Sequence, residues 1–219
     1  MSQTFILRVW MPDRPGALGA LATRIGAAGG DVIGIDILER GAGRAIDELA
    51  IELEDDALVE LLVAEIHQVD GVDIESIRPA SDALHDPRVD ALETAARLAG
   101  ASDVDSALRE LCELGVRTVG AEWGVVIDLA DGSISAQVGE PPAPAWITAF
   151  VAGSRSAADL ADAEAGASDI VWAELPAASL ALVMGGSGEV FRTRERRQAT
   201  AMARIVDARF TDADHRHRD

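Results

Sequence analysis

The residue types that most often carry out catalysis are few in this chain and do not stand at catalytic spacings. It has four histidines, one cysteine and no tyrosine. His67 and His85 have no cysteine or carboxylate at a metal-ligand spacing, and His215 and His217 alternate in a polar stretch near the C-terminus. Cys112 has no second thiol in the chain with which to form a disulfide or a metal site. The sequence therefore predicts no metal site, no catalytic residues and no cofactor.

Two glycine-rich stretches resemble known catalytic or phosphate-binding loops but depart from them. Residues 185–189, Gly-Gly-Ser-Gly-Glu, nearly match the G-x-S-x-G turn of a serine nucleophile, yet Glu189 replaces the closing glycine. Gly41 and Gly43 lack the third glycine of a dinucleotide loop and join two predicted antiparallel strands. We interpret both as ordinary turns. No acid and base can be paired, so we expect that the chain is not an enzyme.

The stretch that could do chemistry of another kind, non-covalent binding, follows the first apolar run. Residues 13–18 read Asp-Arg-Pro-Gly-Ala-Leu and precede a helical pattern. Pro15 suits a first helical turn, and Gly16 permits a tight bend without a Cβ facing an incoming ligand. The first amides of the helix would then offer donors and a positive dipole end to an anion. On spacing alone, a purely structural turn remains the alternative.

Composition and charge limit the classes of partner. The chain has 219 residues, 48% of them hydrophobic, and 38 acidic residues against 19 basic ones give a formal net charge of -19. A surface this acidic repels nucleic-acid phosphates and anionic lipids, so we expect neither nucleic acid nor membrane as a partner. We identify no basic and apolar targeting signal at the N-terminus and no apolar run of membrane-spanning length, and we predict a cytoplasmic protein of one or two domains.

The first 80 residues alternate cleanly between strand and helix periodicity. The pattern predicts a strand over 5–10, a helix over 18–28, paired strands around 33–37 and 49–53, a helix over 58–69 that Gly71 ends, and a strand over 72–77. Glu48 and Glu52 alternate with apolar residues, so the hairpin should have one solvated face. The order is β-α-β-β-α-β, the ferredoxin-like arrangement of an α+β fold.

These motifs resemble an ACT domain over residues 4–79, through the D-R-P-G-A-L turn, the Gly-Gly-Asp-Val-Ile segment and the element order. The resemblance implies a regulatory module of residues 1–80 that pairs side by side and binds an amino acid. The ligand-binding residues that it implies are Asp13, Arg14, Pro15, Gly16, Ala17, Leu18, Asp31, Val32 and Ile33. Many ligand-binding members have Asn where this chain has Asp31. An ionised aspartate only accepts hydrogen bonds, so it suits a ligand ammonium.

Beyond Pro79 the composition changes, and we place a connector at 81–87, a second α+β domain at 88–211 and a polar tail at 212–219. Helical patterns cover 89–96 and 104–112, with Ser102 as the expected cap and Gly115 as the expected end. Strands are predicted over 121–129 and 134–138, joined at Asp131 and Gly132, and over 170–175 and 180–184. A helix around 146–150 and a long helix with an apolar face from Ala199 to Phe210 complete the pattern.

This order of helices and hairpins over 88–210 is similar to the GAF family of sensory domains. The resemblance implies an antiparallel sheet with helices on one face and loops over the other, which could enclose a small-molecule pocket. The local charge exception is a cluster of arginines, 192, 194, 196 and 197, at the start of the last helix, where positive charge opposes the helix dipole.

We therefore expect a non-catalytic regulatory homodimer that binds an amino acid or similar small molecule at the paired first domains and signals through the second domain, with an unidentified protein as a further partner. Two alternatives stay open at this point. One is a ligand-free dimeric adaptor, and the other is an enzyme with an unrecognised site in residues 88–210.

Overall fold

The computed structural model describes residues 2–80, 87–160, 169–186, 188 and 190–216. The chain divides into two compact units, Met1–His85 and Asp86–Asp219. Most of the expected connector, as well as His85, Ser187, Glu189 and His217, lies outside the described residues.

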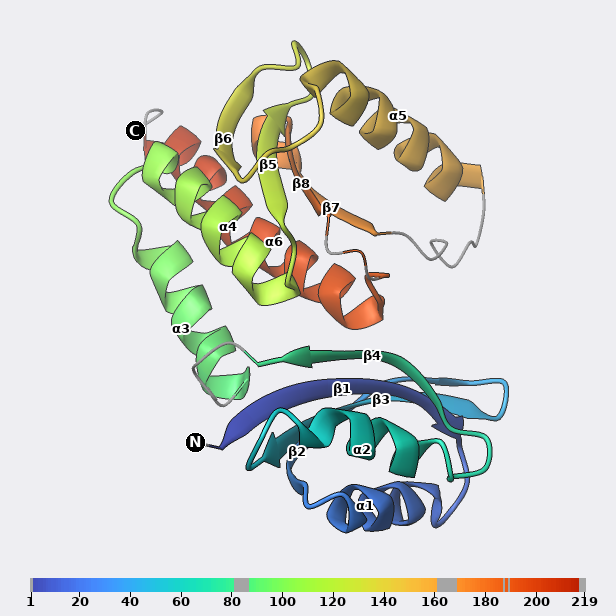
Figure 1. The fold of residues 1–219 in the computed structure, drawn as a ribbon. Coiled ribbons are helices and arrows are strands. Elements are labelled where there is room, and N and C mark those ends of the chain that lie inside the picture. Colours follow the sequence, from blue (N-terminus) through green and yellow to red (C-terminus); the bar gives the residue numbers. More distant parts are fainter. Residues whose placement is uncertain (1, 81–86, 161–168, 187, 189, 217–219) are drawn as a thin grey trace. The chain divides into compact units, whose positions relative to one another are not determined.

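The first unit has the predicted β-α-β-β-α-β order (Figure 1). Its elements are β1 (Gln3–Pro12), α1 (Ala17–Ala27), β2 (Asp31–Gly41), β3 (Arg44–Leu53), α2 (Leu58–Ile66) and β4 (Asp73–Pro79). The four strands form one antiparallel sheet in the order β2-β3-β1-β4, and α1 and α2 lie against one of its faces. The expected ferredoxin-like α+β fold is confirmed for this unit.

Strand register determines which residues of the first unit are buried. Leu7 lies opposite both Leu49 and Ile77, and Leu49 lies opposite Ile35, so these four residues form one row on the face that the helices cover. Leu7 and Leu49 are fully buried in the core together with Leu21 of α1. The period-two pattern of the sequence thus becomes a layer of aliphatic side chains beneath two amphipathic helices.

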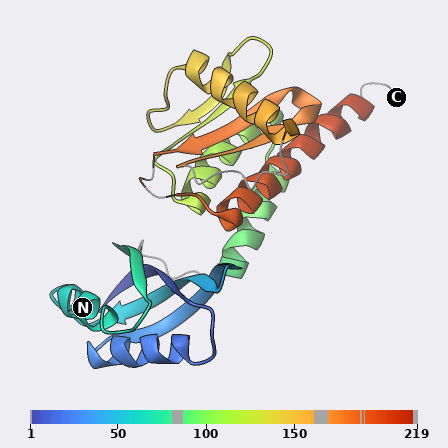
Figure 2. The same cartoon turned by 90° about the vertical axis from the view of Figure 1, so that its right-hand side faces the viewer.

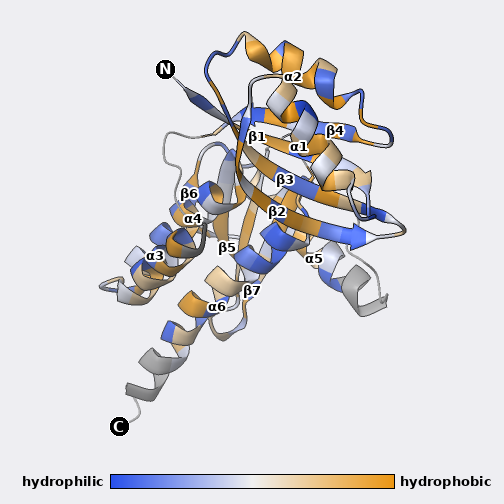
Figure 3. Ribbon diagram, turned by 90° about the horizontal axis from the view of Figure 1, so that it is seen from below, coloured by the Kyte–Doolittle hydropathy of each residue, from blue (hydrophilic) through white to orange (hydrophobic). Residues whose placement is uncertain are grey.

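The outer strand β2 keeps its apolar residues partly in solvent. Ile33, Ile35 and Ile37 are 40%, 44% and 50% exposed because β2 forms the edge of the sheet. Figure 3 shows the hydrophobic part of β2 along this border of the sheet. An apolar strand with unpaired backbone groups on one side is a surface at which a second strand can add.

The second unit contains two β-hairpins between helices. Its elements are α3 (Pro87–Gly100), α4 (Val104–Val119), β5 (Trp123–Asp128), β6 (Ile134–Val138), α5 (Pro144–Leu160), β7 (Ile170–Leu175), the short 3-10 helix η1 (Pro176–Ala178), β8 (Leu180–Gly185) and α6 (Thr193–Arg216). The antiparallel sheet has the order β6-β5-β8-β7. Both predicted hairpins are therefore present, and they meet through β5 and β8.

Helices cover both faces of this second sheet (Figure 2). Residues of α4 and α6, such as Leu111 and Val206, share one core with Leu182, while Ile147 and Val151 of α5 share another with Val183. The expectation that loops roof the second face is wrong. The apolar spacing of Ile147 and Val151 produces a helix whose buried side covers that face instead.

Three helix boundaries also differ from the prediction. Helix α4 passes through Gly115, which packs closely against Met184, and ends at Gly120 with φ of 72°. Its N-cap is Asp103, whose carboxylate accepts a hydrogen bond from the Ser106 amide at 2.8 Å, so Ser102 is not the cap. Helix α6 continues to Arg216, and residues 212–216, expected in a polar tail, are helical.

Candidate functional site

The turn between β1 and α1 is held to the neighbouring hairpin by backbone hydrogen bonds. The Asp13 amide donates to the Gly43 carbonyl at 3.0 Å, and the Ala17 amide donates to the Arg14 carbonyl at 3.3 Å. Asp13, Arg14, Pro15 and Gly16 are exposed, while Ala17 is buried at the start of the helix. The predicted turn residues therefore form one surface at the N-terminal end of α1.

Gly16 is the N-cap of α1 and has φ of 89°, the left-handed conformation that other residues avoid. It makes no side-chain cap, and a Cβ built on it would have no heavy atom within 4 Å. The first amides of an α-helix lack intrahelical acceptors. Here the Ala17 amide donates to the Arg14 carbonyl, and no cap side chain covers the next amides, those of Leu18 and Gly19. Such amides are donors from which an anionic group can accept hydrogen bonds.

The second predicted segment, Asp31, Val32 and Ile33, begins β2 at the other end of the sheet. Asp31 lies opposite Glu52, whereas the end of β2 and the β1 to α1 turn lie beside Arg44. One copy of the chain does not bring Asp31 next to Gly16. The two segments can meet only if a second copy supplies one of them.

The pattern search missed a charged residue near the turn, Asp47 of β3. It lies opposite Val9 and Ile37, on the face of the sheet that the helices cover, and is 4% exposed. Among the described residues, its Oδ1 atom has no hydrogen-bond partner. Burial raises the pKa of the Asp47 carboxyl, with Arg40 opposing and Asp13 reinforcing the shift. The sequence does contain a signal for this residue. Asp47 is two residues before Leu49 and four before Ile51, so strand alternation places its charge on the same buried face.

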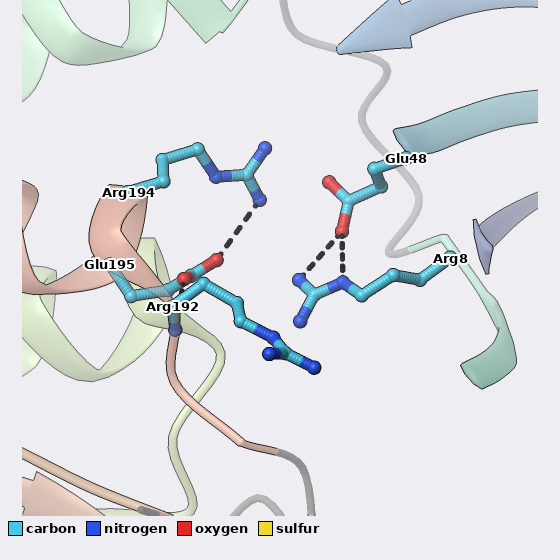
Figure 4. A network of polar contacts seen from close by, with 5 residues as sticks. All are labelled: Arg8, Glu48, Arg192, Arg194 and Glu195. Atoms are coloured by element: carbon cyan, nitrogen blue, oxygen red, sulfur yellow. Dashed lines mark hydrogen bonds and ion pairs between the residues drawn. The ribbon is translucent and has the colours of Figure 1, made fainter. Parts of the chain in front are cut away.

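Two further sets of charged side chains, one in each unit, form ion pairs and hydrogen bonds (Figure 4). In the first unit, Arg8 donates from Nε and a terminal nitrogen to Glu48 Oε2, at 3.3 and 2.8 Å. In the second unit, Glu195 accepts from the Arg192 amide at 2.8 Å and pairs with Arg194 at 3.4 Å. Glu195 at the third position of α6 thus caps the helix and places a negative charge where the arginine cluster opposes the dipole.

The single thiol of the second unit is inert by position. Cys112 is fully buried, and this burial raises its pKa to about 12, so the reactive thiolate is scarce at neutral pH. Among the residues that the structure describes, no three histidine, cysteine, aspartate or glutamate side chains are grouped to hold a metal ion. Across the same part of the chain, every helix is too short or too polar to cross a membrane.

The family comparison bears on this first unit. The model of the ACT domain matches residues 5–71. Residues 5–71 form an ACT domain. The match lies within the first unit, and it supports a regulatory, ligand-binding role for that unit.

Solved structures resemble parts of the chain at low identity. The ACT domain of GTP pyrophosphokinase from Chlorobium tepidum is 16% identical over 36% of this chain and 100% of that chain, with a TM-score of 0.30. An uncharacterized protein from Thermotoga maritima is 18% identical over 37% and 100%, also with 0.30. A bacteriophytochrome from R. palustris is 10% identical over 82% and 42%, with 0.42. The resemblance of the second unit to GAF domains is one of element order alone. The search of curated proteins found no match.

Proposed function

We propose that this protein is a cytoplasmic regulatory homodimer that binds a free amino acid where two ACT domains pair, and that passes this signal to a protein partner through the GAF-like unit. The observation that carries the proposal is the uncapped N-terminus of α1 at Gly16, beside an exposed apolar strand edge. The helix end offers donors for a carboxylate, and the edge offers a seam for a second copy.

Pairing of β2 with the β2 strand of a second copy would create a composite site. Two antiparallel β2 strands that meet near Asp36 place the start of one strand beside the end of the other. The partner copy's β2 start would then approach the turn of residues 13–18, which the Asp13 to Gly43 hydrogen bond holds near the end of β2. The predicted ligand-binding residues, 13–18 and 31–33, become neighbours in such a pair.

The strength of such a site suits a metabolite sensor. Charge-assisted hydrogen bonds contribute about 1.5–3 kcal/mol each, and two or three of them, less the cost of immobilising a small ligand, correspond to dissociation constants of roughly micromolar to millimolar order. Ligand at about a hundred times its dissociation constant should stabilise the protein by about 2.7 kcal/mol, which raises the melting temperature by several degrees.

The test is a thermal-shift screen of the full chain against the common L-amino acids, repeated with Gly16→Val. Because a branched side chain at φ of 89° is strained, the quantity to compare is the ligand-induced shift and not the melting temperature itself. Gly120→Val is the matched control, since Gly120 has φ of 72° and equally open surroundings in the second unit. Only Gly16→Val should lose the shift.

The screen also separates the alternatives. If no amino acid at millimolar concentration moves the melting temperature, the sensing proposal fails. A ligand-free adaptor would then be favoured by the exposed isoleucines of β2, which support pairing without any ligand. Arg192→Ala should respond like the parent, because the proposal gives the arginine cluster no role in binding.

A further inference from the structure

Asp47 is a buried carboxylate in a row of the sheet that is otherwise apolar. Across the sheet this row runs Ile37, Asp47, Val9 and Ile74. Val9 is fully buried, while Ile37 at the outer end of the row is half exposed. The Asp47 carboxylate therefore lies on the helix-covered face of the sheet, on β3, the strand next to the edge strand β2.

One oxygen of this carboxylate lacks a hydrogen-bond donor. Oδ1 of Asp47 is inaccessible to solvent and has no partner in the described part of the chain. A buried polar atom left without a partner costs about 1–3 kcal/mol, and more when it is charged. Such atoms are rare in folded proteins, and each calls for an explanation such as an ordered water, an ion or a functional role.

The charged groups that act on Asp47 are Arg40, near the end of β2, and Asp13 of the candidate binding turn. Arg40 occupies the next row on the same face, opposite Ala45, and Asp13 follows the end of β1. Arg40 Nε and Asp13 Oδ1 are 4.0 Å apart, and the two side chains are 58% and 41% exposed. A contact this long between exposed groups holds neither firmly, so Arg40 can swing aside at little cost.

Helix α1 starts at the same end of the sheet. Ala17, its first residue, shares the core with Met11 and Ala45 of that end. The uncapped amides at the start of α1 and the carboxylate of Asp47 are thus an anion site and a cation site on one side of one sheet end. An α-amino acid carries a carboxylate and an ammonium one carbon apart, which matches this pairing of opposite sites.

The chemistry of the cation favours an ammonium over a metal ion. Calcium takes six to eight oxygen ligands, whereas no three histidine, cysteine, aspartate or glutamate side chains are grouped to hold a metal among the described residues. An ammonium needs only a few acceptors, and one carboxylate oxygen with an open lone pair is enough to fix it.

We propose that Asp47 is the specificity-determining residue that receives the ammonium of the amino acid, whose carboxylate binds at the start of α1. The ammonium donates to Oδ1 and replaces Arg40 as the counter-ion. This rests on the proposed function and assigns the ammonium to Asp47 in place of Asp31, which is exposed at the start of β2. Ligands whose amino nitrogen is acylated should be rejected.

The experiment measures binding by calorimetry and thermal shift on the full chain, with the common L-amino acids, their N-acetyl forms and ethylamine as probes. The variants are Asp47→Asn and Arg44→Gln. Asparagine keeps the shape of Asp47 and removes its charge. Arg44→Gln is the control, because it removes an arginine at the same sheet end that pairs with Asp73 at 2.6 Å. Parent-like far-ultraviolet circular dichroism confirms that each variant folds.

The expected result is that an amino acid binds the parent, that its N-acetyl form does not, and that Asp47→Asn weakens binding about tenfold to a hundredfold, the worth of one charge-assisted hydrogen bond. Arg44→Gln should bind like the parent. If an amino acid binds Asp47→Asn as tightly as the parent, the Asp47 assignment is overturned while the proposed function stands. If only ethylamine binds, and Asp47→Asn abolishes this, the cation site stands and amino-acid sensing fails. If neither probe class binds the parent, both are overturned.

Discussion

Asp47 shows how one side chain can depart from the pattern around it without disturbing the fold. Its neighbours in phase, Ala45 and Leu49, are buried, and the strand places Asp47 with them. Alternation predicts the strand correctly because most in-phase positions are apolar. Alternation cannot predict a role for Asp47, because the charged groups near its carboxylate, Arg40 of β2 and Asp13 after β1, come from other parts of the sequence.

At the residue scale, the raised pKa of Asp47 predicts a pH-dependent effect of Asp47→Asn. A carboxyl whose pKa is higher in the folded state than its ordinary 3.8 binds more protons when folded, so its ionisation costs stability above the folded pKa and nothing below 3.8. Asp47→Asn should therefore unfold at higher urea concentration than the parent at neutral pH. The difference should shrink as pH falls through the folded pKa and vanish below about 4.

Asp73→Asn is the control for this measurement, because Asp73 is largely exposed and belongs to the pair with Arg44. Urea midpoints of the two variants and the parent, taken across the acid range, give the comparison. If the advantage of Asp47→Asn grows toward low pH instead, the buried carboxyl is not the cause.

At the scale of single elements, the packing of α4 against the second sheet leaves no room at Gly124 of β5. A Cβ there would lie 2.6 Å from Val116 and 3.3 Å from the Cys112 sulfur. Gly124→Ala should lower the free energy of unfolding by about 1–3 kcal/mol, the usual cost of overpacking. Gly153→Ala in α5, where the added Cβ meets nothing within 4 Å, should raise it by about 0.4–1 kcal/mol. Urea unfolding of both variants tests this; equal effects would contradict it.

The same close packing explains why the end of α4 was predicted too early. A glycine after an apolar run commonly ends a helix, so Gly115 was read as a stop. In the fold it is a contact point, since a Cβ would lie 2.8 Å from the Met184 sulfur. Glycine serves both purposes: it allows a helix to pack closely against a sheet, and it commonly ends a helix. Sequence alone separates them only when the facing strand is known.

The edge strand β2 leads to the prediction that concerns assembly. We expect the parent to sediment as a homodimer at tens of micromolar, because pairing buries Ile33, Ile35 and Ile37 and satisfies an open strand edge. Ile35→Glu should shift the population to monomer, since it buries a charge at the seam. Leu92→Glu is the control, as Leu92 is 71% exposed on α3 of the second unit. A monomeric parent would contradict the pairing.

At the scale of the whole molecule, each hydrophobic core is built from one unit. The core of the first unit draws its buried residues from positions 5–72, and the two cores of the second draw theirs from 98–206. We therefore expect residues 1–80 expressed alone to unfold cooperatively, as should residues 87–219. Hydrogen exchange of the isolated first unit should show protection in β1 and β3. Absence of a cooperative transition in either part would contradict independent folding.

The sequence predicts this two-part organisation well because local periodicity, turn residues and the composition change after Pro79 all agree. The covering of the second sheet was harder to predict. Trp146, Ile147 and Phe150 indicate a helix, but which face of the sheet it covers depends on the order β6-β5-β8-β7, in which the second hairpin adds beside β5. That order is a long-range pairing, and no short window of the sequence contains it.

Because its only thiol is buried, the folded chain should react very slowly with cysteine-directed labels. With a pKa of about 12, Cys112 holds roughly one thiolate per ten thousand thiols at pH 8, and its side chain is fully covered. A spin label or fluorophore attached through Leu61→Cys, at a position of α2 that is 44% exposed and outside β2, would therefore report from one known place in each copy. The distance between the labels on two paired copies would report how the copies are arranged. Its change on adding an amino acid would show whether the ligand draws the two copies closer together.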